Sequence, residues 1–546
     1  MKVLGIEGTA HTFGVGIVEE TREDGRDPKI LASALDMFRP ESGGIHPREA
    51  ANHHADVAGA ILEKALATAG LAARDIDLVA FSQGPGLGPC LRTAATAARA
   101  FAIAAGKPLV GVNHCVAHLE IGRAVTPADD PVLLYASGGN TQIIAYTEGR
   151  YRVFGETLDV GVGNMLDKFA REEGIPFPGG PEIEKIAKGG SKLLELPYSI
   201  RGMDMAFSGI LTAARAHLAK GESMADVCFS IQETTFAMLT EVTERALAHT
   251  EKHEVVLGGG VACNERLFQM TREMAEARGA KAYRPAKGLL IDNGAMIAHQ
   301  GYMQRAHAAK DLSETIVDQR QRTDDIAVSW RGPERRVFLG AVDGAYHGAE
   351  AVVAATRLIE RAAITKRRSP KPYRHALLDR SLRAARTRAE ARALVGARRA
   401  GVRTPLVYDL HEAESLLVLE RLEGEQLKET LHREPARAEG LLRALGEACA
   451  RLHASHLVHG DLTTSNVLVQ PDGALALIDF GLASPTDEDE AKGVDLHVLM
   501  EGLTATHADI PDAFARVLDG YRAGGGTRAV EEKVEEIARR GRYRGT

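Results

Sequence analysis

Residues 5–16 read Gly-Ile-Glu-Gly-Thr-Ala-His-Thr-Phe-Gly-Val-Gly, a glycine-rich turn that joins two short apolar runs at 2–6 and 15–18. Similar turns follow apolar runs at 137–141 and 258–264. Glycine lets the backbone approach a phosphate closely, and exposed amide groups then bind its oxygens. One such turn is also explained by tight strand-to-helix geometry. Three of them, each after a predicted strand, predict a nucleotide-binding site.

The first 310 residues alternate short β-branched runs with alanine-rich stretches, which is typical of an α/β fold. Strands are predicted at 2–6, 15–18, 78–81, 132–136 and 255–257, and helices at 94–105 and 229–249. Residues 311–336 lose this periodicity, and the polar run 319–325 is predicted to be an exposed connection. A second pattern follows, with strands expected at 337–341 and 351–355. We therefore predict two domains, 1–329 and 330–546.

Composition narrows the class of protein. The chain has 546 residues, of which 45% are hydrophobic and 26% charged, as in soluble globular proteins. The formal net charge is -7, so a nucleic-acid-binding surface would need locally segregated basic residues. Five scattered cysteines without a CxxC pair indicate a reducing compartment. The early charges argue against a signal peptide, and no apolar run is long enough for a membrane helix. We predict a cytoplasmic protein without membrane contact.

Two histidines in the run His-Cys-Val-Ala-His at 114–118 are spaced for metal binding. Side chains at i and i+4 share one face of a helix, so His114 and His118 can bind the same ion. The spacing is also explained by two surface histidines. The motif is not that of zinc proteases, because Cys115 stands where a general-base glutamate would be. Asp292 is a candidate third ligand and Tyr135 a candidate fourth, although a helix N-cap and a core aromatic residue explain them equally well.

The second domain carries two motifs with the spacing of a kinase catalytic site. The run His-Gly-Asp-Leu-Thr-Thr-Ser-Asn occupies 459–466, where Asp461 would orient a hydroxyl and Asn466 would bind Mg²⁺. Asp-Phe-Gly follows a predicted strand, and its Asp479 would also bind Mg²⁺. Because both motifs occur in the right order, they predict a kinase-like domain that binds ATP and magnesium.

The upstream residues fit an ATP site less strictly. A turn containing Gly340, Gly344 and Gly348 joins two predicted strands, but it is not a strict GxGxxG. Lys366 would reach the phosphates from the third strand, and Glu390 on a predicted helix would pair with it. Taken alone, each of these charges is also explained by a surface position.

Two features of protein kinases are missing from the sequence. No Ala-Pro-Glu follows Asp479, and acidic residues at 487–490 come directly after the motif. Gly460 replaces the arginine that usually binds a phosphorylated activation loop. The peptide-binding platform is therefore not predicted, and the domain need not phosphorylate protein.

Basic residues are concentrated in the second domain. Residues 361–403 contain fourteen Lys or Arg against two acids, and the chain ends in an arginine-rich run at 539–544. Such runs are usually solvated surface, but they also fit contact with nucleic-acid phosphates.

The first half resembles the universal tRNA threonylcarbamoyladenosine transferase family, whose two-lobed fold is that of actin, Hsp70 and sugar kinases, the ASKHA fold. The matching motifs follow in order across residues 1–300: GIEGTAHTFGVG at 5–16, GPGLG at 84–88, NHCVAH at 113–118, SGGNT at 137–141, GVGNMLD at 161–167, FPGGP at 177–181, FSG at 207–209, GGGVACN at 258–264 and DNG at 292–294. This resemblance implies two lobes with a nucleotide cleft between them.

The resemblance also implies a reaction, in which threonylcarbamoyl is transferred from threonylcarbamoyl-AMP to N6 of adenosine 37 in tRNAs that read A-starting codons. The donor would come from a separate synthase. A metal ion, iron or zinc, would be held by His114, His118, Tyr135 and Asp292. The donor would be held by Tyr135, Ala136, Ser137, Gly138, Gly139, Asp167, Gly180, Glu184 and Asn264. Glu7 stands where many relatives of this superfold keep an aspartate for metal–ATP, which argues against ATP phosphoryl transfer in this half.

Residues from about 337 to 546 resemble the small atypical kinase of the KEOPS complex, which works with the transferase as an ATPase or kinase. The resemblances together imply a two-lobed α/β domain followed by an α+β protein-kinase-like domain. They imply a tRNA-modifying transferase with an appended ATPase, which works with KEOPS accessory subunits.

Two other functions fit parts of the sequence. A metalloprotease joined to a signalling kinase is disfavoured by Cys115 and by the missing peptide platform. A first half that only senses nucleotide is disfavoured by the complete set of His114, His118 and Asp292.

Overall fold

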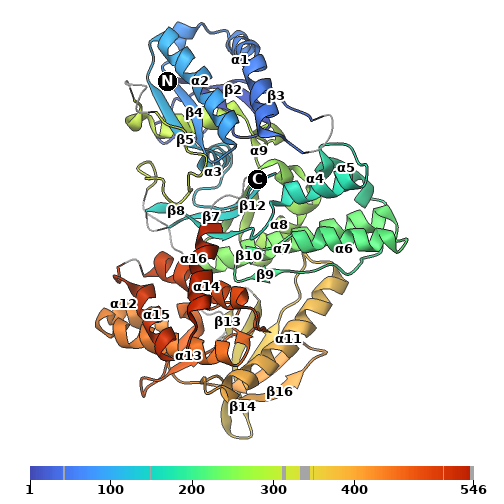
Figure 1. The fold of residues 1–546 in the computed structure, drawn as a ribbon, viewed down its shortest axis with the longest axis vertical. Helices are drawn as coiled ribbons and strands as arrows, with labels where there is room; N and C mark the ends of the chain where they lie inside the picture. Colours follow the sequence, from blue (N-terminus) through green and yellow to red (C-terminus); the bar gives the residue numbers. More distant parts are fainter. Residues whose placement is uncertain are drawn as a thin grey trace. The chain divides into compact units, whose positions relative to one another are not determined.

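The computed structural model describes residues 1–40, 44–147, 149–309, 315–332, 345–348, 350–507 and 509–540. It divides into two compact units (Figure 1). The described residues up to 332 form the first unit, except for 200–204, which belong with the second unit. The second unit holds the described residues from 345 onwards. Trp330 and Arg331, just beyond the predicted boundary at 329, therefore belong to the first unit.

The first unit begins with a five-stranded sheet in the order β3-β2-β1-β4-β5. Its strands are β1 Lys2–Glu7, β2 Thr12–Glu19, β3 Lys29–Met37, β4 Leu78–Gly84 and β5 Leu109–Asn113. The first three strands are antiparallel, and β4 and β5 run parallel to β1. The helices of this part are α1 Pro47–Ala69, α2 Gly88–Ala105 and α3 His114–Val125.

A second sheet repeats the arrangement of the first, in the order β12-β11-β6-β7-β8. Its strands are β6 Val132–Ala136, β7 Thr141–Thr147, β8 Arg150–Glu156, β11 Glu254–Gly258 and β12 Lys281–Tyr283. Again three antiparallel strands come first and two parallel strands join them on the side of the first strand. This shared order shows that the first unit has two lobes of the same topology.

The helices of the second lobe follow the same alternation. They are α4 Val162–Glu172, α5 Gly179–Ala187, α6 Ser208–Ala219, α7 Met224–Thr250, α8 Glu265–Ala277 and α9 Lys287–Leu290, after which α10 Gly294–Met303 returns to the first lobe. Two-residue strands, β9 Ile200–Arg201 and β10 Asp204–Met205, pair with each other. The predicted strands and helices of the first half all lie within observed elements, so the α/β prediction is confirmed.

Helix α10 packs directly on the backbone of the first sheet, and glycines make this contact possible. A Cβ added to Gly5 would lie 2.2 Å from the Ala298 nitrogen, and one on Gly16 would lie 2.1 Å from the Ala295 nitrogen. A Cβ on Gly294 would lie 2.1 Å from the Gly16 nitrogen. Real Cβ atoms do not approach backbone this closely, because interiors are already close-packed. The contact fixes the start of α10, which Asp292 precedes by two residues.

The second unit opens with an antiparallel sheet in the order β13-β14-β15-β17-β16. Its strands are β13 Ala345–His347, β14 Ala351–Leu358, β15 Arg361–Arg368, β16 Val407–His411 and β17 Leu416–Glu420, with helix α11 Ala376–Arg399 beside them. The strand predicted at 351–355 is thus confirmed within β14. The strand predicted at 337–341 lies outside the described residues.

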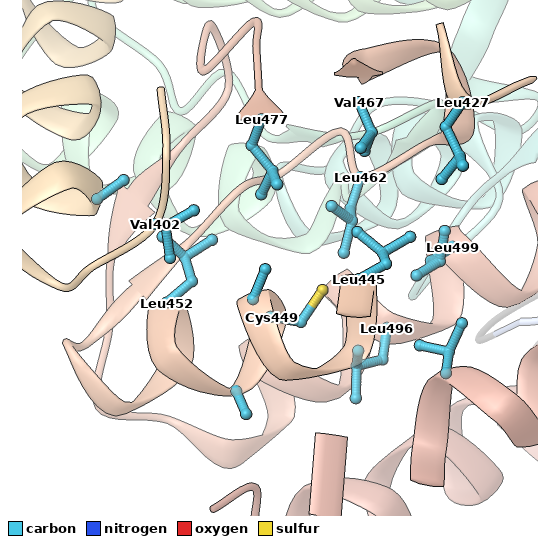
Figure 2. Close-up of a cluster of buried hydrophobic side chains, with 14 of the residues drawn as sticks. Val402, Leu427, Leu445, Cys449, Leu452, Leu462, Val467, Leu477, Leu496 and Leu499 are labelled. Atoms are coloured by element: carbon cyan, nitrogen blue, oxygen red, sulfur yellow. The ribbon is translucent and has the colours of Figure 1, made fainter. Parts of the chain in front are cut away.

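The rest of the second unit is mainly helical, and its described residues share an apolar core with the sheet and α11 (Figure 2). Leu445, Cys449 and Leu452 project from α13 into it, and Leu496 and Leu499 project from α14. The elements are β18 Glu425–Gln426, α12 Leu427–Arg433, α13 Ala438–Ala454, β19 Leu457–Val458, β20 Val467–Val469, β21 Leu475–Leu477, β22 Ser484–Pro485, α14 Asp489–Thr506, α15 Ala513–Ala523 and α16 Arg528–Arg540. Among the described residues, no helix is both long and apolar enough to cross a membrane.

Candidate functional site

The two spaced histidines occupy the first and second turns of α3, as their spacing predicted. Asn113 caps this helix, because its Oδ1 accepts the Val116 amide at 3.1 Å. His114 and His118 are 4% and 2% exposed, so neither is a surface histidine. Both rings face the interior of the first unit, between its two lobes.

Four donor atoms from both lobes converge at this point. His114 Nε2 lies 3.0 Å from the Tyr135 hydroxyl at the end of β6. Asp292 Oδ1 lies 3.4 Å from Nε2 of both His114 and His118. The ligand atoms of the two histidines and Asp292 all lie within 4.8 Å of one another. The structure therefore brings together the four residues predicted as metal ligands.

A buried carboxylate fixes the orientation of His114. Glu7, at the end of β1, is 0% exposed, and its Oε2 accepts the Nδ1 hydrogen of His114 at 3.0 Å. Its other oxygen accepts the Thr9 amide at 2.8 Å and the Thr9 hydroxyl at 2.6 Å. With Nδ1 donating to Glu7, the other ring nitrogen, Nε2, faces Tyr135 and Asp292, where a metal ion that displaced its proton would meet the Nε2 lone pair. Both carboxylate oxygens of Glu7 are therefore engaged by His114 and Thr9 in this structure.

The charges of the cluster are strongly coupled. Burial opposes the charge on His114, but Glu7 and Asp292 outweigh it and raise the pKa of His114 well above its usual value. Burial would raise the pKa of Asp292, but His114 and His118 hold it well below its usual value. Burial lowers the pKa of His118, and the neighbouring His114 adds to this. Two carboxylates therefore compensate the cationic charge of this site.

This donor set fits a transition metal. Imidazole, phenolate and carboxylate suit iron or zinc, and a buried pocket that presents all three from rigid elements is preorganised for binding. Cys115 is not part of the set, because burial raises the pKa of its thiol to about 11. A carboxylate behind a ligating histidine, as Glu7 is here, is the usual support of such a ligand.

The glycine turn 137–141 lies beside this cluster and is itself tightly packed. Gly163 donates its amide to Ser137 O, and Asn164 donates its amide to Gly138 O, both at 3.0 Å. A Cβ on Gly161 would lie 2.3 Å from Gly138 O. Gly259 has φ of +88°, and a Cβ there would lie 2.3 Å from the Ala136 oxygen. The turn after β6 is therefore packed between two other glycine-containing segments of the second lobe, 161–164 and the one that contains Gly259.

The remaining residues predicted to hold the adenylate lie around this turn in the same lobe. Asp167 on α4 accepts the Gly179 amide at 2.7 Å, next to Gly180 at the start of α5. Burial raises the pKa of Asp167. Glu184 accepts the Glu265 amide at 3.1 Å at the start of α8. Asn264 caps α8 and also donates to Gln232 Oε1 at 3.0 Å. The structure thus links α4, α5 and α8 at this end of the second sheet.

In the second unit, Lys366 on β15 contacts Glu390, the residue predicted to pair with it, and also Asp479, which was predicted only as a Mg²⁺ ligand. Its Nζ lies 2.6 Å from Glu390 on α11 and 2.6 Å from Asp479. Burial disfavours the charge on Lys366, but Asp479 and Glu390 outweigh it and raise its pKa above the usual value. Asp479 has φ of +62°, a strained backbone conformation of the kind that often marks functional loops.

The predicted catalytic loop is also assembled. Asn466 Nδ2 donates to Asp461 Oδ2 at 3.1 Å and to its backbone oxygen at 2.9 Å. Gly348 donates its amide to Ala351 O at 3.0 Å at the start of β14. Gly340 and Gly344, predicted as phosphate contacts, lie outside the described residues.

Sequence reasoning missed the residue that supports this loop. Asp495 on α14 is 2% exposed and accepts the amides of His459 and Gly460, both at 2.8 Å. It also contacts His453 Nε2 at 3.2 Å. No motif surrounds Asp495, so only the three-dimensional contact identifies it. Arg368 was also missed, although it lies two residues after Lys366 and contacts Glu390 at 2.6 Å. The alternation of a strand could have suggested it.

Comparisons with known proteins identify a family for each of the two units. The model of the tRNA N6-adenosine threonylcarbamoyltransferase family matches residues 29–299, and the RIO domain model matches residues 359–496. Three relatives carry the name probable bifunctional tRNA threonylcarbamoyladenosine biosynthesis protein. The relative from Methanosarcina mazei is 48% identical and covers 99% of this chain and 99% of its own. The relative from Methanothermobacter thermautotrophicus is 48% identical and covers 100% of this chain and 100% of its own. The relative from Methanocorpusculum labreanum is 49% identical and covers 99% of this chain and 99% of its own.

Proposed function

The chain belongs to the family of bifunctional tRNA threonylcarbamoyladenosine biosynthesis proteins, and on this premise we propose that its first unit transfers threonylcarbamoyl from threonylcarbamoyl-AMP to N6 of adenosine 37 beside a bound metal ion. The observation that carries the proposal is the convergence of donor atoms from His114, His118, Tyr135 and Asp292. Iron and zinc both suit these ligands.

The chemistry needs positioning more than acid–base catalysis. The adenosine amine attacks the carbamoyl carbon, the bond from that carbon to the phosphate oxygen breaks, AMP leaves with the electron pair, and the proton lost by the amine passes to the departing phosphate or to water. A bound Lewis-acid metal would polarise the donor or hold its phosphate. The chain's own residues must hold the donor so that its carbonyl faces an extruded base, because an exocyclic amine is a weak nucleophile.

The second lobe supplies that positioning. The Ser137 amide is already bonded to Asn140 O at 2.8 Å, so Gly138 and Gly139 are the part of this turn that suits the phosphate of the adenylate, because glycine allows close backbone approach. Asp167 and Glu184 on α4 and α5 suit hydroxyl groups of the donor, and Asn264 adds an amide at the start of α8. These residues lie beside the metal ligand Tyr135, so the donor would sit between the metal and α8.

The second unit is the kinase-like half of this bifunctional protein. We propose that Asn466 and Asp479 hold Mg²⁺, that Lys366 binds the ATP phosphates, and that Asp461 orients the attacking hydroxyl or water. Lys366 contacts Asp479 in this structure, so that contact must open when Mg²⁺ and ATP bind. The missing peptide platform favours ATP hydrolysis over protein phosphorylation.

The remaining partners follow from the substrate. A separate synthase would supply threonylcarbamoyl-AMP, and accessory subunits of a KEOPS-type complex would support transfer. A tRNA substrate supports the predicted cytoplasmic location.

The test uses the full chain with unmodified tRNA, purified threonylcarbamoyl-AMP and the accessory subunits, and reads adenosine 37 by nucleoside mass spectrometry. We expect threonylcarbamoyladenosine with the wild type and with His307→Ala, whose exposed histidine lies outside the site. His114→Ala should give none. Full modification by His114→Ala, or no product from the wild type, would contradict the proposal.

A further inference from the structure

The polar run predicted to be an exposed connection is in fact packed against the first unit. We call residues 318–331 the strap. Thr323 is only 4% exposed, and only some of its neighbours face solvent. Within the run 319–325, the predicted exposure holds at residues 319, 320 and 325, but it fails at Thr323, because a polar side chain can also be buried against a partner.

The strap begins near the N-terminus of α3, the helix that carries the two histidines. Asp318 donates its amide to Gln83 O at 2.9 Å, which places the strap beside β4. Gln321 Oε1 then accepts a hydrogen bond from Asn113 Nδ2 at 3.2 Å, and Gln321 Nε2 donates to Gln83 Oε1 at 3.1 Å. Asn113 is the N-cap of α3, so Gln321 fixes the amide whose oxygen caps the helix.

The middle of the strap covers the side of α3. The Thr323 side chain lies close enough to Cys115, between the two histidines, to lower the pKa of its thiol against the effect of burial. Ile326, Val328 and Trp330 then alternate with exposed residues and pack against a buried cluster. That cluster includes Val116 and Leu119 of α3 and the proposed ligand Tyr135. Its buried members are Cys115, Val116, Leu119, Ala128, Leu133, Tyr135, Ile144, Tyr146, Tyr151 and Val256.

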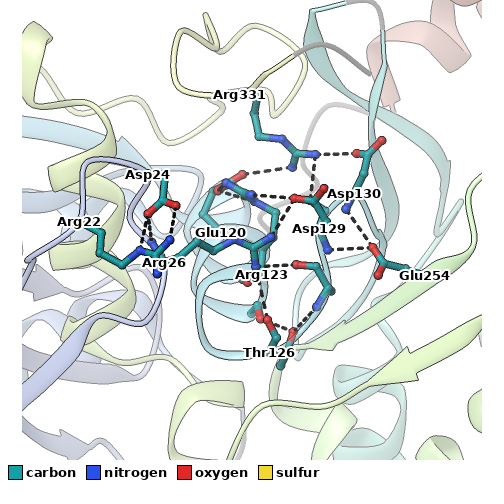
Figure 3. A network of polar contacts seen from close by, with 12 residues as sticks. Arg22, Asp24, Arg26, Glu120, Arg123, Thr126, Asp129, Asp130, Glu254 and Arg331 are labelled. Atoms are coloured by element: carbon teal, nitrogen blue, oxygen red, sulfur yellow. Dashed lines mark hydrogen bonds and ion pairs between the residues drawn. The ribbon is translucent and has the colours of Figure 1, made fainter. Parts of the chain in front are cut away.

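The strap ends in a buried arginine that holds the second turn of α3 (Figure 3). The Arg331 side chain is 5% exposed, and it lies 3.5 Å from Glu120 Oε1 and 2.5 Å from Asp130 Oδ1. Glu120 is two residues after His118 and also accepts from Arg123 at 2.9 Å. Removing Arg331 would leave buried carboxylates with fewer partners, which buried charges tolerate poorly.

We propose that the strap is a positioning element of the transferase site, and that Gln321 and Arg331 set the placement of His114 and His118 by holding α3 at two points. The inference rests on the proposed metal site. Metal ligands must be held within about 0.5 Å of their working geometry, so a small shift of α3 is enough to weaken binding. The strap lies beyond the segment 29–299 that matches the transferase family, and it leads directly to the second unit.

The test measures Co²⁺ binding by the full chain after metal removal, through the visible absorption of the bound ion. We expect Gln321→Ala and Arg331→Met to weaken Co²⁺ binding and change its absorption spectrum, with a loss in affinity of about tenfold for Arg331→Met. The control is Arg320→Ala, an exposed arginine of the same strap, which should bind Co²⁺ as the wild type does. Arg331→Lys, which keeps the charge, should restore part of the affinity.

Amide exchange of α3 in the metal-free chain provides a second readout that does not need a bound metal. The two strap variants should speed exchange at 114–120 and leave α8 unchanged. Wild-type Co²⁺ affinity and spectrum in both variants, with only a lower melting temperature, would overturn the proposal, because the strap would then be merely structural. A wild type that binds no Co²⁺ would refute the metal site, and unchanged α3 exchange would then refute the strap as well. Should Arg331→Met fail to fold, the result with Gln321→Ala tests the proposal, since this variant removes only two half-buried hydrogen bonds, to Asn113 and Gln83.

Discussion

Glu7→Gln tests whether the buried carboxylate orients His114 for metal binding. One carboxylate oxygen of Glu7 accepts hydrogen bonds from the Thr9 amide and the Thr9 hydroxyl. The other oxygen accepts the Nδ1 hydrogen of His114. Glutamine has the same shape but one acceptor oxygen. If that oxygen stays with Thr9, the amide NH₂ faces His114 Nδ1 and drives the ring proton to Nε2. The lone pair that would bind the metal is then lost.

The expected magnitude follows from the role of the carboxylate. Loss of a partner that orients a ligating histidine costs about 10- to 100-fold in metal affinity, which is about 1.4–2.8 kcal/mol. Burial of Glu7 at 0% exposure favours the upper end, because no water can replace the lost acceptor. The assay is a competition titration of the full chain with Zn²⁺ and a chelator of known affinity.

A matched control exists in the same unit. Glu20 is also buried and contacts Nδ1 of a buried histidine, His299, at 2.7 Å. His299 is not one of the four converging residues. Glu20→Gln should therefore lower stability without changing Zn²⁺ affinity. Wild-type Zn²⁺ affinity in Glu7→Gln, or an equal loss in both variants, would refute the orientation argument.

Three further predictions concern other parts of the two sites. Asp461→Asn should lower ATP turnover by about 100-fold or more, because the orienting carboxylate is lost. The control is Asp472→Asn, in an exposed turn. Wild-type turnover by Asp461→Asn would refute the assignment. Asp495→Asn should speed amide exchange at His459 and Gly460, because one amide loses its acceptor at a cost of about 1–3 kcal/mol; unchanged exchange would show that the loop needs no such support. Gly161→Ala should lower kcat/KM for tRNA modification by about 100-fold, because its Cβ would displace the turn at Gly138; Gly59→Ala, where a Cβ meets nothing within 4 Å, is the control, and equal activity of both variants would contradict a role of this turn.

Local patterns predicted the fold well. The glycine turns, the alternation of strands and helices, and the i, i+4 histidines all act over a few residues, so the sequence displays them directly. Asp292 and Tyr135 were proposed beside the alternatives of an N-cap and core packing, and the cap belongs to the next residue, because Asn293 Oδ1 accepts the Met296 amide.

Long-range support could not be predicted in this way. Glu7 and His114 are separated by 107 residues, and Asp495 lies 36 residues after His459. Nothing near Glu7 or Asp495 in the sequence marks its partner. The strap shows the opposite error at one position, since the polar run 319–325 predicted exposure, while Thr323 within it is buried against the first unit.

The metal content of the purified full chain tests the central claim most directly. Elemental mass spectrometry should find close to one iron or zinc per wild-type chain and per His307→Ala chain. It should find almost none in the double variant His114→Ala with His118→Ala, while the circular dichroism spectrum stays that of the wild type. A wild type without metal, or a double variant that keeps it, would contradict the assignment of these four residues as a metal site.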